Sequence, residues 1–435
     1  MPTKSFRILT VAVALGTAAL LVSAVSANAS EEHYGSTNIS RVAIPPAVPK
    51  NVKITLTEYD YYTVGGETTM VDTAIKAFEA KYPNVTINRE EVPYPGITKL
   101  VDLEAAGETP NIVIEDPGSG LTEYYAGVVP LTEFFTPAFL AKFTPGSRLA
   151  ASLDGSLYGL PVLGGDDTAL IYNKTDFAKA GITSPPTTWA ELLNDAKLLT
   201  VPSLHQYGFG VSAVEDEEST WQLEPFVFTA GGTLGNPDSP AWTAAMQLWL
   251  TMVKDGYMPL SVTSWHQTDE ETHFLANNVA MEINGPWNVP GLLAQSTIKW
   301  GAAPIPVQKA GQQLAVPFAG ESWSIGKASP VLEAASAAFI QFVTDDTAMN
   351  ETATHDGGYL PLQSSLIKSY GAKYPPYAVF ADELLNSRAR VYGNKGAYTQ
   401  LSSDVQVMID AVLTQKETIP AALAVLAKQV KALPS

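Results

Sequence analysis

The chain has 435 residues, of which 46% are apolar and 16% charged, and this is long enough to form two domains. Its 44 acidic residues outnumber its 26 basic ones, giving a formal net charge of −18. Such a surface repels phosphate groups, which argues against a nucleic-acid partner. Cysteine is absent, which excludes disulfides, thiol nucleophiles and cysteine-ligated metal sites.

The N-terminus has the three-part pattern of a secretory signal peptide over residues 1–29. Two basic residues precede an apolar run from Ile8 to Val22, and Ala27 to Ala29 provide small residues for cleavage. The run is shorter than the roughly 20 residues that span a bilayer, so a cleaved signal is favoured over an uncleaved anchor helix. Residues 30–50 are expected to form a flexible leader. We therefore expect a periplasmic or secreted protein without a lipid-modified cysteine.

The next segment alternates short strands with amphipathic helices. Period-2 and apolar patterns predict strands near residues 52–56, 85–88 and 112–114, and helical periodicity predicts helices over 68–82 and 97–106. Strands that alternate with helices of this length indicate βαβ units and a mostly parallel sheet.

The alternation resumes after Gly159-Leu160-Pro161. Strands are expected over residues 168–172 and 279–283, and Thr188 with Glu191 forms the sequence pattern of a helix capping box. Further helices are expected over residues 241–254, from Ser329-Pro330 through Phe342, and over 401–413 and 419–433. The sequence thus predicts two α/β lobes.

The motifs of common enzyme classes are incomplete. Neither Gly118 to Gly120 nor Gly208 to Gly210 completes G-x-G-x-x-G, and Gly320 to Ser324 lacks the last glycine of a nucleophile elbow. The five histidines form no zinc pattern, and the acidic run Glu215 to Glu218 lacks calcium-loop spacing, so we interpret the run as a solvated loop. We expect no catalytic residue, metal or cofactor, although paired carboxylates of a glycosidase would carry no fixed spacing.

Seven of the eight tryptophans fall into two groups. Three lie inside expected helices and are assigned to cores: Trp189, Trp242 and Trp249. Four others lie in or beside turns, with carboxylates or amides nearby in sequence: Trp221, Trp265, Trp287 and Trp323. An indole offers a flat face to a sugar ring, and carboxylates accept hydrogen bonds from its hydroxyl groups. The second group therefore favours a polyhydroxylated neutral ligand, with packing as the alternative for any single tryptophan.

Six motifs occur in a characteristic order over about residues 50–430. They are FEAKYP at 78–83, TPNIV at 109–113, LIYNK at 170–174, WAELL at 189–193, FLANNVAMEINGPW at 274–287 and GGYLP at 357–361. In this order they resemble the extracellular solute-binding protein family 1, the maltose-binding-protein-like sugar receptors of ABC importers.

This resemblance implies a two-lobed α/β fold of the type II periplasmic-binding-protein class, with the ligand between the lobes. Each lobe would be a mostly parallel sheet flanked by helices, with crossings near residues 160–165, 300–304 and 345–353. The implied lobes are 51–162 plus 304–348 for the N-lobe, and 163–303 plus 349–435 for the C-lobe.

The resemblance also implies ligand-contacting positions. Asp166 matches a carboxylate that binds sugar hydroxyls, and Trp287 matches a stacking aromatic residue. With Trp265 added from its turn position, the candidate set is Tyr59, Asp116, Asp166, Trp221, Trp265, Trp287, Gly320, Trp323, Tyr359 and Arg388. Glu321 departs from the small residue that the family usually has beside Gly320.

The implied function is that of a monomeric binding component of an ABC importer. It would capture a carbohydrate, an oligosaccharide in the leading interpretation, and deliver it to the transmembrane permease by lobe closure. Two alternatives stay open. The same fold could bind a polyol, polyamine, peptide or ferric ion, with phenol groups at Tyr61-Tyr62 and Tyr124-Tyr125 for iron, or the chain could be a secreted glycan hydrolase using Asp116 and Asp166.

Overall fold

The computed structural model describes most of the chain after the expected leader. The described residues are 48, 50–63, 65–93, 96–162, 168–295, 297–318, 320–345, 359–361, 363–385, 387–390 and 397–433. The expected signal peptide, most of the leader and Asp166 lie outside them, as does much of the expected crossing at 345–353.

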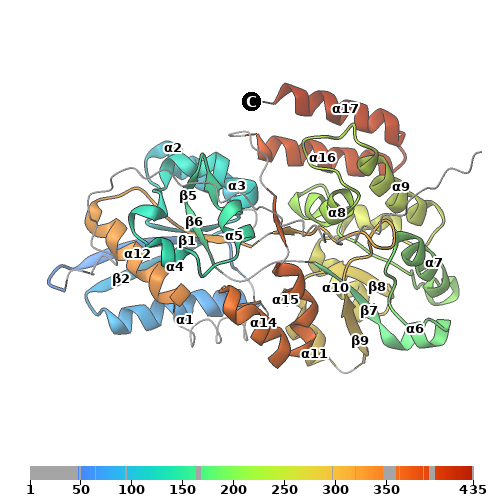
Figure 1. The fold of residues 1–435 in the computed structure, drawn as a ribbon, viewed down its shortest axis with the longest axis horizontal. Helices are drawn as coiled ribbons and strands as arrows, with labels where there is room; N and C mark the ends of the chain where they lie inside the picture. The colour runs from blue at the N-terminus through green and yellow to red at the C-terminus, as the bar shows by residue number, and fades with distance from the viewer. Residues whose placement is uncertain are drawn as a thin grey trace, which may run out of the picture. The chain divides into compact units, whose positions relative to one another are not determined.

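The first sheet has five strands in the order β2-β1-β3-β11-β6, of which β1, β2 and β6 are labelled in Figure 1. The strands are β1 (Ile54–Asp60), β2 (Val85–Glu91), β3 (Ile112–Glu115), β6 (Gly159–Pro161) and β11 (Ser322–Ile325). β1 pairs in parallel with β2 and β3, whereas β11 runs antiparallel to β3 and β6. The late strand β11 therefore returns to a sheet otherwise built from the first third of the chain.

The helices that accompany this sheet are α1 (Gly65–Lys81), α2 (Ile97–Ala106), α3 (Pro117–Tyr124), α4 (Pro137–Leu140), α5 (Pro145–Ala150) and α12 (Pro330–Asp345), and a short hairpin joins β4 (Ser152–Leu153) to β5 (Ser156–Leu157). Among them α1, α2 and α12 lie where periodicity predicts a helix, whereas α3, α4 and α5 were not predicted. Phe78 of α1 packs edge-on against Phe339 of α12, so helices from distant parts of the chain share one core.

The second sheet has three strands in the order β8-β7-β9. Its strands are β7 (Ala169–Asn173), β8 (Met281–Asn284) and β9 (Trp300–Ala303). Both pairings are antiparallel, whereas we expected mostly parallel strands. The chain makes a long helical excursion between β7 and β8, and only isolated bridges from Tyr207 and Gly210 run parallel to the segment around β8.

The second core is formed by helices that include the last two of the chain. These helices are α6 (Lys174–Ala180), α7 (Trp189–Leu199), α8 (Glu217–Thr229), α9 (Pro240–Lys254), α10 (Gln267–Leu275), α11 (Val289–Ala294), α16 (Tyr398–Leu413) and α17 (Ile419–Ala432). α16 packs against α8, α9 and α17. Trp189, Trp242 and Trp249 are buried in this core, as predicted, and the capping box of Thr188 is present.

A third, smaller apolar cluster includes side chains of α14 (Ser364–Lys373) and α15 (Ala378–Leu384). Beside it, β10 (Pro317–Phe318) pairs in parallel with β12 (Arg388–Ala389). Ile305 lies in the second core and Val307 exchanges backbone hydrogen bonds with the start of α7, so this segment packs with the second core, whereas we expected it in the N-lobe. No helix in the described part of the chain combines the length and hydropathy needed to cross a membrane.

Candidate functional site

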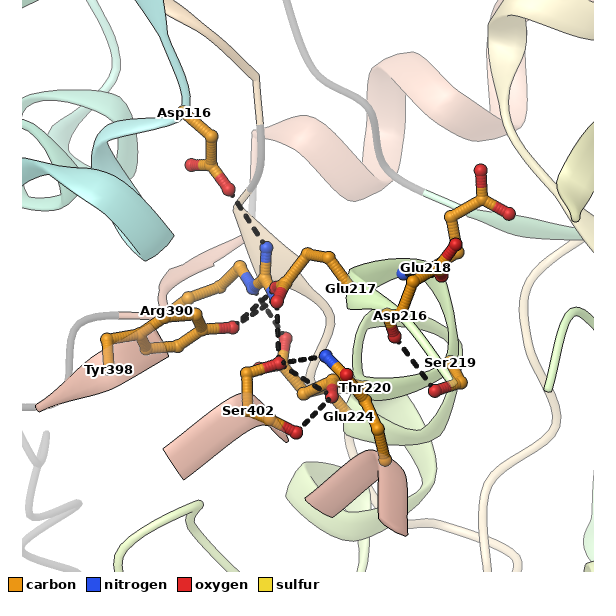
Figure 2. A network of polar contacts seen from close by, with 11 residues as sticks. Asp116, Asp216, Glu217, Glu218, Ser219, Thr220, Glu224, Arg390, Tyr398 and Ser402 are labelled. Carbon is orange, nitrogen blue, oxygen red and sulfur yellow. Dashed lines mark hydrogen bonds and ion pairs between the residues drawn. The ribbon is translucent and has the colours of Figure 1, made fainter. Parts of the chain in front are cut away.

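A buried polar network is centred on Arg390, which directly follows β12 (Figure 2). Its side chain is 1% exposed. Nε donates to Glu224 at 2.7 Å, Nη1 to Asp116 at 3.2 Å, and Nη2 to Glu217 at 2.5 Å and to the hydroxyl of Tyr398 at 2.6 Å. One guanidinium is thus held by three carboxyl groups and a phenol.

Four separate elements bring these groups together. Asp116 comes directly after β3 of the first sheet, and Glu217 and Glu224 lie seven residues apart on one face of α8. Tyr398 and Ser402 lie one turn apart on α16, and Ser402 Oγ donates to Glu217 Oε2 at 2.6 Å. The network therefore links the edge of the first sheet to two helices of the second core.

The guanidinium of Arg390 also lies against two aromatic rings, those of Trp221 and Tyr398. The Arg390 Cζ atom lies 4.8 Å from the ring centroid of Trp221 and 5.6 Å from that of Tyr398. Such cation–π contacts are favourable when the groups are desolvated. Trp221 lies inside α8 and not in a turn, contrary to the sequence interpretation, and the guanidinium occupies one face of its indole.

The acidic run is a solvated loop only in part, because Glu215 is exposed in a turn whereas the three residues after it form the start of α8. Asp216 is the N-cap of α8, and Glu217 and Glu218 occupy its first turn with side chains only 17% exposed. The helix N-terminus favours acidic side chains, and cationic or titratable partners lie within reach. Arg390 contacts Glu217, and His266 lies 3.1 Å from Asp216.

Burial governs the protonation of the network. Burial raises the pKa of Glu224 to about 8, against the opposing attraction of Arg390. Burial also acts to lower the pKa of Arg390, but the carboxyl groups, Glu224 most strongly, hold that pKa well above its usual value. Arg390 is therefore charged at all physiological pH values, and Glu224 is largely protonated at neutral pH.

Several buried atoms of the network have no hydrogen-bond partner among the described residues. They are Trp221 Nε1, Glu224 Oε1 and, on the neighbouring strand, Glu115 Oε2. Buried polar atoms are nearly always paired in folded proteins, so each exception calls for an explanation such as an absent ligand or water. The unpaired indole N–H and carboxyl oxygen that lie in the charged cluster around Arg390 make this network the candidate ligand site.

A second buried group joins Glu321 to the two tyrosines that directly follow β1 of the first sheet. The phenol of Tyr61 donates to Oε1 of Glu321 at 2.6 Å and that of Tyr62 to Oε2 at 2.5 Å. Burial, followed by the charge of Glu321, raises the pKa of Tyr61 well above its usual value. These bonds account for the glutamate in this loop, and the raised pKa keeps the Tyr61 phenol a protonated donor, whereas ferric iron binds phenolate.

Three of the candidate aromatic residues are packed in cores. Tyr59 is fully buried and donates to the carbonyl of Gly96 at 2.5 Å, and Trp323 is 2% exposed within the first core. Trp265 is 7% exposed and stacks on His273 with ring centroids 3.9 Å apart. These contacts give each ring a packing role in the structure.

Trp287 and Tyr359 lie together, as a shared ligand-contacting role would require. Their ring centroids are 6.4 Å apart. Trp287 follows β8 of the second sheet, yet its half-buried ring packs against the core of the first. The indole lies directly over Gly285, where an added Cβ would come within 2.0 Å of the ring. Gly320, another of the candidate residues, has a φ of 136°, a backbone conformation that favours glycine.

Arg388 lies apart from the network. It is exposed on β12 and lines a hollow of about 1030 Å³ together with Tyr172, Trp300 and residues of α15. Sequence reasoning chose Arg388 and missed Arg390, two residues further on, and it also missed Glu224, Tyr398 and Ser402. Nothing local in the sequence distinguishes the two arginines, because the partners of Arg390 come from distant segments.

The chain matches the family of bacterial extracellular solute-binding proteins over residues 73–376. A binding protein of Brucella abortus (strain 2308) is 31% identical over 245 residues, which are 54% of this chain and 59% of that protein. The maltotriose-binding protein of Pyrococcus abyssi is 23% identical over 251 residues, which are 57% of this chain and 53% of that protein. These matches span between half and three fifths of the length of the curated relatives.

Solved structures with the same fold cover most of the chain. A maltose-bound protein of T. maritima superposes with a TM-score of 0.76 at 23% identity, over 87% of this chain and 99% of that one. A solute-binding protein of an ABC transporter from Thermotoga lettingae, bound with α-D-tagatose, superposes with a TM-score of 0.75 at 25% identity. The superposition covers 86% of this chain and 98% of that one. A chitin oligosaccharide binding protein superposes with a TM-score of 0.75 at 18% identity, over 87% of this chain and 98% of that one. The two-lobed α/β fold predicted from the sequence is confirmed.

Proposed function

We propose that this chain, which belongs to the family of bacterial extracellular solute-binding proteins, captures a carbohydrate outside the cytoplasm and delivers it to the permease of an ABC importer. The observation that carries the proposal is the Arg390 network, in which buried hydrogen-bonding atoms have no partner within the described part of the chain. Relatives that bind maltotriose, maltose and chitin oligosaccharides support an oligosaccharide as the ligand.

The chemistry of the network suits hydroxyl groups. A hydroxyl both donates and accepts hydrogen bonds, so it can accept from the N–H group of Trp221 and donate to a carboxyl oxygen of the network. Trp287 and Tyr359 would add flat apolar faces for the C–H surface of a sugar ring. Asp166 lies outside the described residues and stays a predicted contact.

Capture would work by lobe closure about the expected crossings. Ligand shifts the equilibrium between open and closed arrangements only if it binds the closed one more tightly. Asp116 on the first-sheet side and Arg390 on the second would supply that difference, because a ligand held by both is bound most tightly when the two are near each other. The closed form would then be the form that the permease recognises, and we expect the protein to act as a monomer.

Isothermal titration calorimetry with maltose, maltotriose, D-tagatose and triacetylchitotriose tests the proposal. Binding at micromolar Kd, about −8 kcal/mol, with release of unchanged ligand by mass spectrometry, is the expected result. Conversion of the sugar would support a hydrolase, and the Asp116→Asn variant would then lose turnover. Absence of binding to every saccharide, together with binding of spermidine or a ferric salt, would move the protein to the non-sugar alternatives.

A further inference from the structure

We infer that Asp216, Glu218 and His266 form a binding site for a divalent metal ion, with Zn²⁺ as the preferred ion. The three side chains lie at the starts of α8 and α10. Sequence spacing did not reveal this set, because the histidine lies far from the two carboxylates in the chain. The proposed function does not depend on this site.

The separations of the three side chains match those of the ligands of one zinc ion. Nδ1 of His266 lies 3.1 Å from Oδ2 of Asp216 and 3.6 Å from Oε2 of Glu218. One potential ligand atom from each residue lies within 4.8 Å of the other two. Zinc binds nitrogen and carboxylate oxygen at about 2.0–2.2 Å with tetrahedral geometry, which places neighbouring ligand atoms about 3.3–3.6 Å apart. Small side-chain rotations would therefore bring all three atoms onto one ion.

Hydrogen bonds already hold the two carboxylates in position. Oδ1 of Asp216 accepts from the backbone N–H of Glu218 at 3.0 Å, so it is the other oxygen of Asp216 that faces His266. Oε2 of Glu218 accepts from Oγ of Ser212 at 3.0 Å and from the backbone N–H of Gln267 at 2.7 Å. Such bonds orient the ligands before a metal binds, and they are a regular feature of metal sites in proteins.

The charges of the set favour a dication. Both carboxylates approach the imidazole of His266, and an imidazole that binds a metal is neutral, so the set presents two negative charges to the ion. Burial raises the pKa of Asp216, and burial followed by the charge of Asp216 raises the pKa of Glu218. These shifts reflect two poorly solvated charges that repel each other, and a bound dication would relieve both effects. The imidazole is 51% exposed, which leaves the set open to an ion from solvent.

The types of donor atom favour zinc over calcium and magnesium. Imidazole nitrogen together with carboxylate oxygen is a common donor set for zinc. Calcium takes six to eight oxygen ligands, and magnesium takes an octahedron of oxygen atoms that includes several waters. Neither ion gains from the nitrogen of His266. Three protein ligands also leave the fourth tetrahedral position of a zinc ion to water.

An ion at this site would join the first turns of two helices. Its two carboxylate ligands flank Glu217 at the start of α8, and Glu217 contacts Arg390 at 2.5 Å. The third ligand, His266, caps α10. Because the unfolded chain does not hold these three ligands together, metal binding should stabilise the folded protein and raise its melting temperature.

Calorimetric titration with zinc chloride tests the site on protein that carries no histidine tag and has been freed of metal with EDTA. We expect one zinc ion per chain and a higher melting temperature in the presence of zinc. The affinity for zinc should be at least about tenfold greater than that for calcium or magnesium. No saccharide is added, so the outcome is independent of the proposed function.

Two variants and a control locate the ion. His266→Ser removes the nitrogen ligand and keeps a residue that caps helices well. Glu218→Gln removes a charge, and its amide oxygen can still accept the bonds from Ser212 and Gln267. Each variant should bind zinc at least about tenfold more weakly than the wild type. The control His205→Asn changes an exposed histidine with a φ of 53°, a conformation that asparagine tolerates, and it should bind zinc like the wild type.

The contrary outcomes are distinct. Absence of zinc binding by the wild type overturns the inference and leaves an ordinary ion pair between His266 and the carboxylates. Zinc binding that His266→Ser leaves unchanged places the ion elsewhere and also overturns it. Equal affinities for zinc and calcium would overturn the role of the nitrogen ligand. If His266→Ser melts well below the metal-free wild type, the affinity of Glu218→Gln decides the assignment.

Discussion

The buried carboxyl of Glu224 makes the stability of the protein depend on pH in a direction that can be calculated. Its pKa in the folded protein is about 8, against 4.5 for an unperturbed glutamate, because burial disfavours the charged form. Between these two values the folded state holds a proton that the unfolded state has released. Stability therefore falls as pH rises through this window, by about 1.4 kcal/mol per unit and about 5 kcal/mol in total from this group.

Glu224→Gln should remove this dependence. The amide resembles the protonated carboxyl, and its oxygen can still accept the hydrogen bond from Nε of Arg390. At pH 5 the wild type and the variant should therefore be equally stable within about 1 kcal/mol. At pH 8.5 the variant should be the more stable by about 5 kcal/mol, since it no longer has a proton to lose.

The difference in stability between the wild type and Glu224→Gln is measured by urea denaturation at half-unit steps from pH 5 to pH 8.5. Unfolding is followed by tryptophan fluorescence. Other buried carboxyl groups with raised pKa, such as Glu270 and Glu282, are present in both proteins, so the difference between the two curves isolates position 224. Glu417→Gln, at an exposed glutamate, should run parallel to the wild type. If the Glu224→Gln curve also runs parallel to it, the reasoning about burial at this position is wrong.

Three further outcomes follow from the packing. Trp287→Ala should weaken saccharide binding at least about tenfold with the fold retained, and unchanged affinity in calorimetry would mean that the indole only packs. Tyr61→Phe removes a donor from the buried carboxylate of Glu321 and should lower the free energy of unfolding by about 1–3 kcal/mol; a neutral effect in urea denaturation would contradict that bond. Gly208→Ala would place a Cβ 1.9 Å from the carbonyl oxygen of Ala196 and should cost about 3 kcal/mol or more, whereas a melting temperature equal to that of the wild type would rule out this close approach.

Local patterns predicted the elements well. The helix expected over 97–106 is α2, with the same bounds, and the capping box at Thr188 and Glu191 is present as expected. Helix periodicity and capping depend on residues within a few positions of each other, so they are visible in the sequence. Strand direction in the second sheet was predicted wrongly, because its strands pair antiparallel. Long segments separate these strands in the chain, and local sequence patterns do not show in which direction the chain re-enters the sheet.

The candidate site was only partly predictable for the same reason. Asp116 and Trp221 were chosen from the sequence and meet at Arg390, whereas Trp323, equally placed beside a turn, lies in a core. An indole beside a turn can face either solvent or a hydrophobic core, and its neighbours in sequence do not decide which.

The sequence by itself determined the α/β character, the positions of most helices and the resemblance to sugar receptors, because these depend on short-range periodicity and on ordered motifs. Only the tertiary structure decided which charges meet. Arg390 lies 274 residues from Asp116 and 166 from Glu224 in the chain, and its burial follows from the packing of α8, α16 and the end of β3 around it. A contact between such distant residues depends on how whole elements pack, so it exists only in the folded chain.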